Sequence, residues 1–289
     1  MNTTIKGSIE QRTLIAMLSK SELESMARRC RVEICKMTHR AKAGHPGGSL
    51  SEIDILVALY GNYLSVKPDQ PKWSDRDRFI LSKGHASPGM YAILSEIGFI
   101  ENQDLESYRV KGGICQGHVD MKWTPGVDFS AGSLGMGLSF GIGCALAAQL
   151  DESERQIYVM LGDGELQEGS IWEAAMAAAH HELGNLNVFV DRNNIQNDDF
   201  CIEQMRMFDI PSKWISFGWH VKEINGHDME EICSGIEWMK QNKDGPSVII
   251  ANTVKGKGVS FMENNPQFHG AAPNDEQLAL ALEELGVIQ

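Results

Sequence analysis

The sequence contains no long hydrophobic run and no excess of positive charge, and both absences narrow its function. No apolar stretch approaches the roughly 20 residues that cross a bilayer, and the start, MNTTIKGSIEQ, lacks the charged and apolar segments of a secretion signal. Lys and Arg total 26 against 39 Asp and Glu, so the formal net charge is −13. We therefore expect a cytoplasmic protein that binds neither nucleic acid nor membranes.

Paired cysteines, repeats and linkers are also missing. The six cysteines, Cys30, Cys35, Cys115, Cys144, Cys201 and Cys233, include no CxxC and no disulfide framework, which predicts reduced thiols. No low-complexity tract or Pro/Gly/Ser linker divides the 289 residues, of which 42% are hydrophobic. We expect a single domain over residues 1–289, which begins with an N-terminal extension at 1–20.

What the chain does have is an alternation of strand-like and helix-like segments. Short apolar runs predict strands at the start of 79–98 and at 156–162, 186–191 and 247–254, and HVKEIN at 220–225 is predicted as a further strand. Helical patterns lie at 21–41, at 171–185 and from 228 onward. This alternation predicts an α/β fold with a doubly wound, mostly parallel sheet that is flanked by helices.

The helix predicted at 21–41 has a basic end and a glycine-rich stop. We expect the cluster RRCRVEICKMTHRAK at 28–42 to form a solvated helix face near the helix C-terminus. The segment GHPGGSLS then ends the helix, and Ser49 or Ser51 can cap the next helix, EIDILVALYGNYL.

Two polar loops bracket the helix predicted at 171–185. MLGDGELQEGS follows one strand and DRNNIQN follows the next, so that Asn193 comes 30 residues after Asp163. A strand, helix, strand order at this spacing forms a right-handed unit with parallel strands. Both loops then emerge at the carboxyl ends of the strands, where open α/β sheets bind ligands. The sequence therefore predicts a site between the two loops.

The polar groups of these loops suit Mg²⁺ bound to a diphosphate. Asp163 offers a carboxylate, Asn193 an amide oxygen and Ile195 a backbone carbonyl. Three hard oxygens with little charge favour Mg²⁺ completed by water and phosphate oxygens. Gly162 and Gly164 let a diphosphate approach the helix N-terminus. The alternative, that Asp163 only caps the helix, leaves the second loop unexplained, and the sequence has neither an EF-hand nor a Walker A pattern.

Five of the nine histidines adjoin a glycine: His45, His85, His118, His227 and His269. Histidines on glycine turns after strands are poorly placed to pack in a core, so we expect at least three of the five to line one pocket. Zinc does not explain them, because no two share a ligand spacing and no cysteine pair supports them. Neutral imidazoles that exchange protons with hydroxyl groups fit the pattern better.

The motif GDGELQEGSIWEAA followed by DRNNIQ resembles the thiamine diphosphate motif, which begins with GDG and ends with NN. Around it stand KAGHPGGSLS, LSKGHASPGMY, QGHVD, AGSLGMGLS and TVKGKGVSFMENNPQFHGAAP. In this order the blocks resemble the cofactor-diphosphate half of transketolase. The likeness extends from residue 25 or so to the C-terminus.

The resemblance to transketolase implies a role for each matching residue. It implies that Asp163, Asn193 and the Ile195 carbonyl hold Mg²⁺, or another divalent cation such as Ca²⁺ or Mn²⁺, on thiamine diphosphate. The residues implied to contact the cofactor are His85, Gly132, Ser133, Leu134, Gly162, Asp163, Gly164, Glu168, Asn193 and His269. His45, His118 and His269 match catalytic imidazoles around the sugar. Glu168 and Glu173 match acidic residues at the subunit interface.

Three positions depart from the family pattern. Val119 stands where proline is usual, Met136 stands where glutamine is usual, and the glycine usual at or before Asp199 is missing. These departures leave the cofactor site intact and concern the shape of the channel for the acceptor sugar.

The resemblance further implies half of an enzyme. In this family the glutamate that activates the cofactor ring lies in a separate pyrimidine-binding domain, and the tail NDEQLALALEELGVIQ offers only one closing helix. A further domain needs roughly 150 residues. We therefore expect the pyrimidine-binding and C-terminal domains on a second chain in an α₂β₂ complex. Its reaction would move a two-carbon glycolaldehyde unit from a ketose to an aldose, usually sugar phosphates.

Three alternatives remain. A ketoacid dehydrogenase subunit or half of a deoxyxylulose phosphate synthase shares the GDG motif, but dehydrogenase subunits lack the paired GHPGG and KGHAS loops found here. A regulatory scaffold without chemistry would have lost the sugar-facing histidines, which are all present. A transketolase for an unusual ketose, such as a sulfonated or branched sugar, stays open, because the residues that grip the far end of the sugar lie mostly on the other half.

Overall fold

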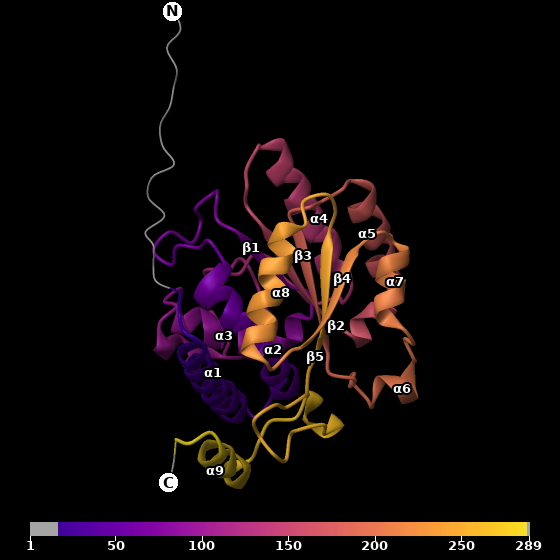
Figure 1. Ribbon diagram of the computed structural model, residues 1–289. Helices are drawn as coiled ribbons and strands as arrows, with labels where there is room; N and C mark the ends of the chain where they lie inside the picture. Colours follow the sequence, from indigo (N-terminus) through magenta and orange to yellow (C-terminus); the bar gives the residue numbers. More distant parts are fainter. Residues whose placement is uncertain (1–16, 288–289) are drawn as a thin grey trace, which may run out of the picture.

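A five-stranded sheet forms the centre of the computed structural model, which describes residues 17–287 (Figure 1). The strands are β1 (Arg78–Leu81), β2 (Ile157–Gly162), β3 (Leu186–Arg192), β4 (His220–Asn225) and β5 (Ser247–Asn252). They lie in the order β1-β2-β3-β5-β4, and each neighbouring pair is parallel. The predicted α/β fold is confirmed. Of the extension predicted at 1–20, residues 1–16 lie outside the described range.

Helices cover both faces of this sheet (Figure 1). One face carries α1 (Lys20–Ala41), α2 (Pro46–Ala58), α3 (Ser87–Glu96) and α8 (Met229–Gln241), and the other carries α4 (Met136–Leu150), α5 (Gly169–His180) and α7 (Ile210–Ser216). The shorter elements are η1 (Leu59–Tyr63), η2 (Gly84–Ala86), η3 (Asn102–Ser107), η4 (Gly164–Gln167), α6 (Cys201–Gln204), η5 (Pro266–His269) and α9 (Asp275–Glu284). Because the crossovers use both faces, the sheet is doubly wound.

Residues of the strands alternate between two separate cores. Tyr158, Met160 and Phe189 join the cluster under α1, α2, α3 and α8. Val159 and Leu161 join the cluster under α4, α5 and α7. Successive side chains of a strand point to opposite faces, and a parallel sheet covered on both faces is apolar on both. Each large apolar side chain that is fully buried stabilises the fold by roughly 1.5–3 kcal/mol.

Helix α2 begins earlier than the sequence predicts. Pro46 lies in its first turn and His45 is its N-cap, so neither Ser49 nor Ser51 caps the helix. Proline is favoured at the first helical position, because its missing N–H would have no partner there. Both serines are buried inside the helix, where Ser49 Oγ donates to the His45 carbonyl (2.9 Å) and Ser51 Oγ donates to Asp191 (2.6 Å). The start of α2 therefore lies beside the end of β3.

Helix α1 confirms the helix predicted at 21–41 and begins with a capping box of Ser19 and Glu22. Its basic cluster is only partly a solvated face. Arg31 is 9% exposed and donates through two nitrogens to the carboxylate of Asp54 in α2. The prediction is wrong at Arg31 because a charge pattern along one helix does not show that a buried carboxylate faces it from another.

The carboxyl ends of the strands point toward the C-terminal part of the chain (Figure 1). The segment that follows β5, drawn in yellow, lies at these ends and finishes with α9. Loops from β1, β2, β3 and β5 therefore meet on one side of the molecule.

None of the helices in the described range 17–287 has the length and apolar character needed to traverse a bilayer. The six cysteines are all free thiols. Burial raises the pKa of Cys35, Cys115 and Cys201 to about 12, so these three thiols stay protonated and unreactive at neutral pH.

Candidate active site

The two polar loops of the predicted bracket meet at the ends of β2 and β3. Asp163 follows β2 directly, and its carboxylate accepts hydrogen bonds from the backbone N–H groups of Gly164 (2.8 Å) and Asn194 (2.6 Å). The Asp163 N–H in turn donates to the carbonyl of Asp191 (3.3 Å). Asp163 is the N-cap of η4 as well. One carboxylate thus caps a short helix and also ties the second loop to the first, which a cap alone does not require.

The side chain of Asn193 is held in one orientation. Its Nδ2 donates to Asp191 Oδ2 (2.9 Å) and to Ser51 Oγ (3.2 Å), and its Oδ1 accepts the N–H of Ile195 (3.2 Å). Asp191 is fully buried and pairs with Lys83 (2.5 Å). Buried partners of this kind orient the atoms that bind a metal.

The oxygens around Asp163 are arranged for a cation. Burial, followed by the charge of Asp191, raises the pKa of Asp163 to about 6, so its ionised form is costly without a positive partner. Lys255 is buried beside it, and its Nζ donates to the Ile195 carbonyl (2.7 Å). Burial lowers the pKa of Lys255 to about 8. The charge of Lys255 compensates Asp163 only in part, since the pKa of Asp163 stays raised, and the remaining cost of ionisation favours a further cation beside the carboxylate.

The ligand set contains a single carboxylate. Within residues 17–287 no group of three or more His, Cys, Asp or Glu side chains could hold a metal ion. The candidate set is instead one carboxylate, one amide oxygen and one carbonyl. Such a set leaves coordination positions for water and phosphate oxygens, which is how Mg²⁺ is commonly bound beside a diphosphate.

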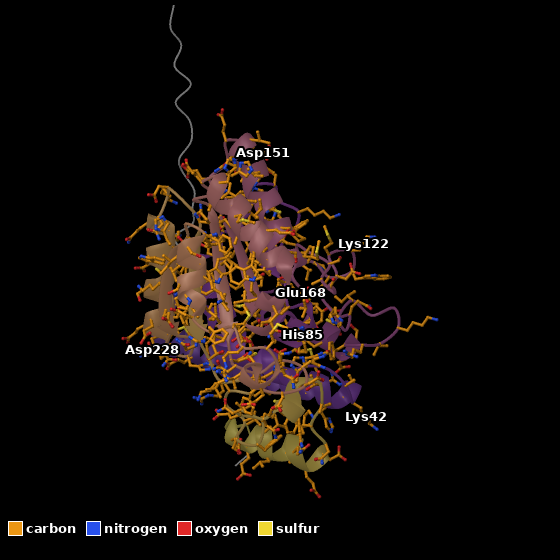
Figure 2. The ribbon with its side chains drawn as sticks, turned by 90° about the vertical axis from the view of Figure 1, so that its right-hand side faces the viewer. Lys42, His85, Lys122, Asp151, Glu168 and Asp228 are labelled. Carbon is orange, nitrogen blue, oxygen red and sulfur yellow. The ribbon has the colours of Figure 1, made fainter. Side chains whose placement is uncertain are left out.

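Four of the five glycine-linked histidines form one cluster beside these loops. The ring centroid of His45 lies 5.1 Å from that of His85, 6.2 Å from that of His118 and 5.5 Å from that of His269. The rings of His85 and His269 stack at 5.2 Å. Figure 2 shows His85 near the middle of the molecule. Four of the five therefore gather in one place, whereas His227 lies outside the group; that they line one pocket stays a prediction.

Burial keeps the clustered imidazoles neutral. It lowers the pKa of His45 to about 4 and, with the charge of Lys255 as the second cause, lowers that of His269 to about 3. The pKa values of His85 and His118 are lowered too, and burial is again the largest cause. A neutral imidazole both donates and accepts a hydrogen bond at pH 7, as a partner of hydroxyl groups must.

His45 also carries an unsatisfied atom. Its Nδ1 is buried and has no hydrogen-bond partner in the part of the chain that the structure describes. In contrast, His269 Nδ1 lies 2.6 Å from Lys255 Nζ. Leaving a buried polar atom unpaired costs about 1–3 kcal/mol, so this nitrogen is placed to meet a ligand or water.

The turn before α4 contains three of the predicted cofactor contacts, Gly132, Ser133 and Leu134. A side chain at Gly132 would meet nothing within 4 Å, so the turn borders open space. It is anchored by Gly135, whose N–H donates to the buried Glu165 (2.8 Å), and by Gly137, whose N–H donates to Ser82 after β1 (3.2 Å). The turn is therefore fixed to the strand ends while its outer surface stays accessible.

The remaining predicted residues lie around Asp163. A Cβ atom on Gly164 would lie 2.9 Å from the Cβ of Gln196, so glycine is needed there for the contact between the two loops. Gly162 is less restricted, with 3.6 Å to the nearest atom of Lys83. Glu168, labelled near His85 in Figure 2, precedes α5 and is exposed, as is Glu173 in the helix.

Several buried charged residues of the site escape the sequence analysis. Lys83 is 2% exposed and pairs with Asp191 (2.5 Å) and with Glu52 (2.9 Å). Burial raises the pKa of Glu52 to about 8. Asp191, Lys255 and Glu165 are the others. Both lysines stand next to a glycine, in KGHAS and KGKG, and this signal could have revealed them. No local pattern distinguishes Glu52 within its buried helix, α2.

Comparison with known proteins identifies the family. The family model described as transketolase, thiamine diphosphate binding domain, matches residues 23–288. The chain belongs to the transketolase family. This confirms the resemblance to transketolase that the sequence motifs indicate.

Two relatives that are named as transketolase subunits match this chain over most of its length. One of the subunits of the apulose-4-phosphate transketolase of Phocaeicola vulgatus is 40% identical over 263 residues, which cover 91% of this chain and 93% of the relative. The 6-deoxy-6-sulfo-D-fructose transketolase subunit SqwG of Clostridium sp. is 42% identical over 242 residues, which cover 84% and 88%.

A solved transketolase shows the same fold over part of its length. The structure of transketolase from Campylobacter jejuni matches with a TM-score of 0.89 and 33% sequence identity over 93% of this chain. The chain spans 43% of the length of that transketolase. It therefore corresponds to the thiamine diphosphate-binding part of the longer protein.

Proposed function

We propose that this chain is the cofactor-binding subunit of a two-chain transketolase, which transfers a two-carbon glycolaldehyde unit from a ketose to an aldose. The supporting observation is that two features meet at the strand ends. The oxygens of Asp163, Asn193 and Ile195 suit a metal-bound diphosphate, and the four neutral histidines suit sugar hydroxyl groups. Lys255 joins the two features, because its Nζ contacts both the Ile195 carbonyl and His269 Nδ1.

Thiamine diphosphate, when bound, supplies the reactive carbon that holds the transferred unit. Asp163, Asn193 and the Ile195 carbonyl would hold Mg²⁺, or another divalent cation, on its diphosphate. The proposed contacts with the cofactor are His85, Gly132, Ser133, Leu134, Gly162, Gly164, Glu168 and His269. His45, His118 and His269 would bind the sugar, because a neutral imidazole can take a proton from a hydroxyl group and return it to a carbonyl oxygen.

The second chain of the proposed enzyme would carry the rest of transketolase. The relatives named as subunits match this chain over most of their length, whereas the chain spans less than half of the longer transketolase. We propose that this partner subunit carries the pyrimidine-binding domain and that two copies of each chain form an α₂β₂ complex in the cytoplasm.

A surface on α4 and α5 would join two copies of this chain. The exposed residues of this surface, called the α4–α5 face, are Met136, Phe140, Gly143, Ala147 and Leu150 of α4 and Met176 of α5. Gly143 and Ala147 are small, so a second helix can approach closely. The face adjoins Glu168 and Glu173, which the resemblance to transketolase assigns to the subunit interface. Two copies related by a two-fold axis would each present this same face.

A second candidate function differs only in the sugar. The two relatives at 40% and 42% identity are named for apulose 4-phosphate and for 6-deoxy-6-sulfo-D-fructose. Val119 and Met136 also depart from the usual pattern of the family. Val119 is buried beside the site, where its backbone N–H donates to the Gly84 carbonyl (3.4 Å). A branched or sulfonated ketose is therefore the alternative donor.

Mixing the purified chain with its partner subunit tests the two-chain proposal. With saturating Mg²⁺ and thiamine diphosphate, the chain alone should cleave no ketose, because in this family the group that activates the cofactor ring lies in the pyrimidine-binding domain. Activity should rise as partner is added and saturate near one partner per chain. Robust two-carbon transfer by the chain alone would contradict the proposal. Comparing kcat/KM for fructose 6-phosphate, apulose 4-phosphate and 6-deoxy-6-sulfo-D-fructose then decides between the two sugar classes.

A further inference from the structure

The fifth glycine-linked histidine, His227, lies outside the histidine cluster, yet both of its ring nitrogens are engaged. In Figure 2 the residue after it, Asp228, lies at the left edge, away from His85. His227 Nε2 accepts the backbone N–H of Val254 (2.8 Å), and Nδ1 lies 2.8 Å from Asp54 Oδ2. Since a backbone N–H can only donate, Nε2 is the unprotonated nitrogen and Nδ1 donates to Asp54. The two contacts therefore fix one neutral tautomer.

Asp54 is held from its other side by Arg31. Both terminal nitrogens of Arg31 donate to the Asp54 carboxylate, at 3.0 and 2.6 Å, and both side chains are nearly buried. Although burial opposes it, pairing with Arg31 and His227 holds the pKa of Asp54 below its ordinary value. Arg31 Nε also donates to the carbonyl of Lys257 (3.0 Å). A charged pair with two parallel hydrogen bonds fixes geometry as well as energy.

These contacts hold a turn at residues 254–257 from both ends. His227 binds the backbone at Val254, and Arg31 binds the backbone at Lys257. The middle of the turn is held as well, because a backbone N–H there donates to a backbone carbonyl at the start of α2 (3.0 Å). The turn is therefore tied to α1 and α2, the two helices that lie farthest from it in the sequence.

Lys255 lies within that turn and reaches the candidate active site. It is 2% exposed, and its Nζ donates to the Ile195 carbonyl (2.7 Å) and lies 2.6 Å from His269 Nδ1. A lysine side chain is a flexible four-carbon stem, so the location of its ammonium group depends on a fixed backbone. A continuous path of contacts thus leads from Asp54 through His227 to Lys255 and the site.

We propose that His227, backed by Asp54, is a positioning residue: by holding the 254–257 turn it places Lys255 between Ile195 and His269. This inference rests on the proposed function, since its consequence is a firmer hold on the diphosphate of thiamine diphosphate. His227 itself touches neither cofactor nor sugar and acts only through the turn.

Three substitutions separate the two hydrogen bonds of His227 in the full chain complexed with its partner subunit. His227→Leu removes both bonds, His227→Asn keeps a donor for Asp54 but does not reach Val254, and His227→Gln places an acceptor near the former Nε2. Calorimetry with Mg²⁺ and thiamine diphosphate should give a dissociation constant about tenfold higher for the Leu and Asn variants and within about threefold of wild type for the Gln variant. His220→Leu is the matched control, because His220 also pairs with an aspartate, Asp244 (2.9 Å), at an exposed position.

A second background separates positioning from simple stabilisation of the fold. If His227 acts through Lys255, His227→Asn should change the affinity by less than about twofold in a Lys255→Met background. Equal losses in both backgrounds, or no loss in either, would overturn the inference. If His227→Leu does not fold, the comparison of the Asn and Gln variants carries the test. A wild-type complex that binds the cofactor but transfers no ketol unit would count against the proposed function alone.

Discussion

At the scale of single residues, Asp163 is the group whose replacement is most informative. It is the one carboxylate of the candidate ligand set, and burial raises its pKa to about 6. Asp163→Ala should therefore weaken Mg²⁺-dependent binding of thiamine diphosphate at least about 100-fold, since it removes a metal ligand rather than an outer partner. The fold should persist, because the substitution also removes a buried charge. Calorimetry and circular dichroism measure the two effects.

The control for this experiment lies on the neighbouring loop. Asp198 is exposed and has no contact with the ligand oxygens, so Asp198→Ala should leave cofactor affinity unchanged. An Asp163→Ala variant that binds the cofactor as tightly as the wild type would show that the metal lies elsewhere.

Single residues also show how far the sequence predicts the site. Asp163 and Asn193 could be predicted because polar residues directly after apolar strands must lie at the sheet edge. His45 could be predicted because it adjoins a glycine in a turn. The pairing of Lys83 with Asp191 could not, because it joins segments more than 100 residues apart and no local pattern records which buried charges meet. Burial of charge is settled by tertiary packing, which periodicity does not describe.

At the scale of elements, helix α4 carries most of the α4–α5 face, through which we propose that two copies of the chain pair. Gly143 is exposed on the α4–α5 face, and a side chain there would meet no atom of its own chain within 4 Å. Gly143→Arg should therefore prevent two copies from pairing and halve the mass of the α₂β₂ complex in analytical ultracentrifugation. The helix itself should be preserved, because Arg is a better helix former than Gly by about 1 kcal/mol.

The matched control places the same charge on a different helix. Leu280 in α9 is 42% exposed and lies outside the α4–α5 face, so Leu280→Arg should leave the mass unchanged. An unchanged mass for Gly143→Arg would exclude this face as the interface.

Elements also differ in how well the sequence predicts them. Strands β2, β3 and β5 follow from their apolar runs, since strands in the middle of a parallel sheet covered on both faces have no polar side to confuse the pattern. The sequence misplaces the start of α2 because two rules for helix starts compete in GHPGGSLS. Serine favours the N-cap and proline favours the first turn, and the buried acceptor at Asp191 draws Ser51 into the helix interior.

At the scale of the whole molecule, the neutral histidines predict a loss of stability in acid. Burial, followed by the charge of Arg109, lowers the pKa of His45 from 6.5 to about 4. Between these values the unfolded chain binds a proton that the folded chain does not, so stability rises with pH. The contribution of His45 is complete above pH 6.5 and is lost as the pH falls toward 4.

Urea unfolding at pH 7.5 and at pH 5 measures this effect. Allowing for the partial exposure of His45, the wild type should lose about 1–2 kcal/mol more than His45→Gln between the two pH values. The variant is the reference for all other titrating groups, because the two proteins share them. Equal losses in the two proteins would mean that His45 titrates as it does in water.

Within residues 17–287, β1 and β4 are the edge strands of the sheet, and an edge strand can pair with a strand of another molecule and begin an aggregate. Strand β1 has only four residues, three of them buried. Strand β4 carries two adjacent charged residues in its middle, Lys222 and the exposed Glu223. A short edge and a charged edge both discourage foreign strands. Both edge strands of the sheet therefore protect the separate chain from aggregation, which the proposed two-chain enzyme requires of each subunit before assembly.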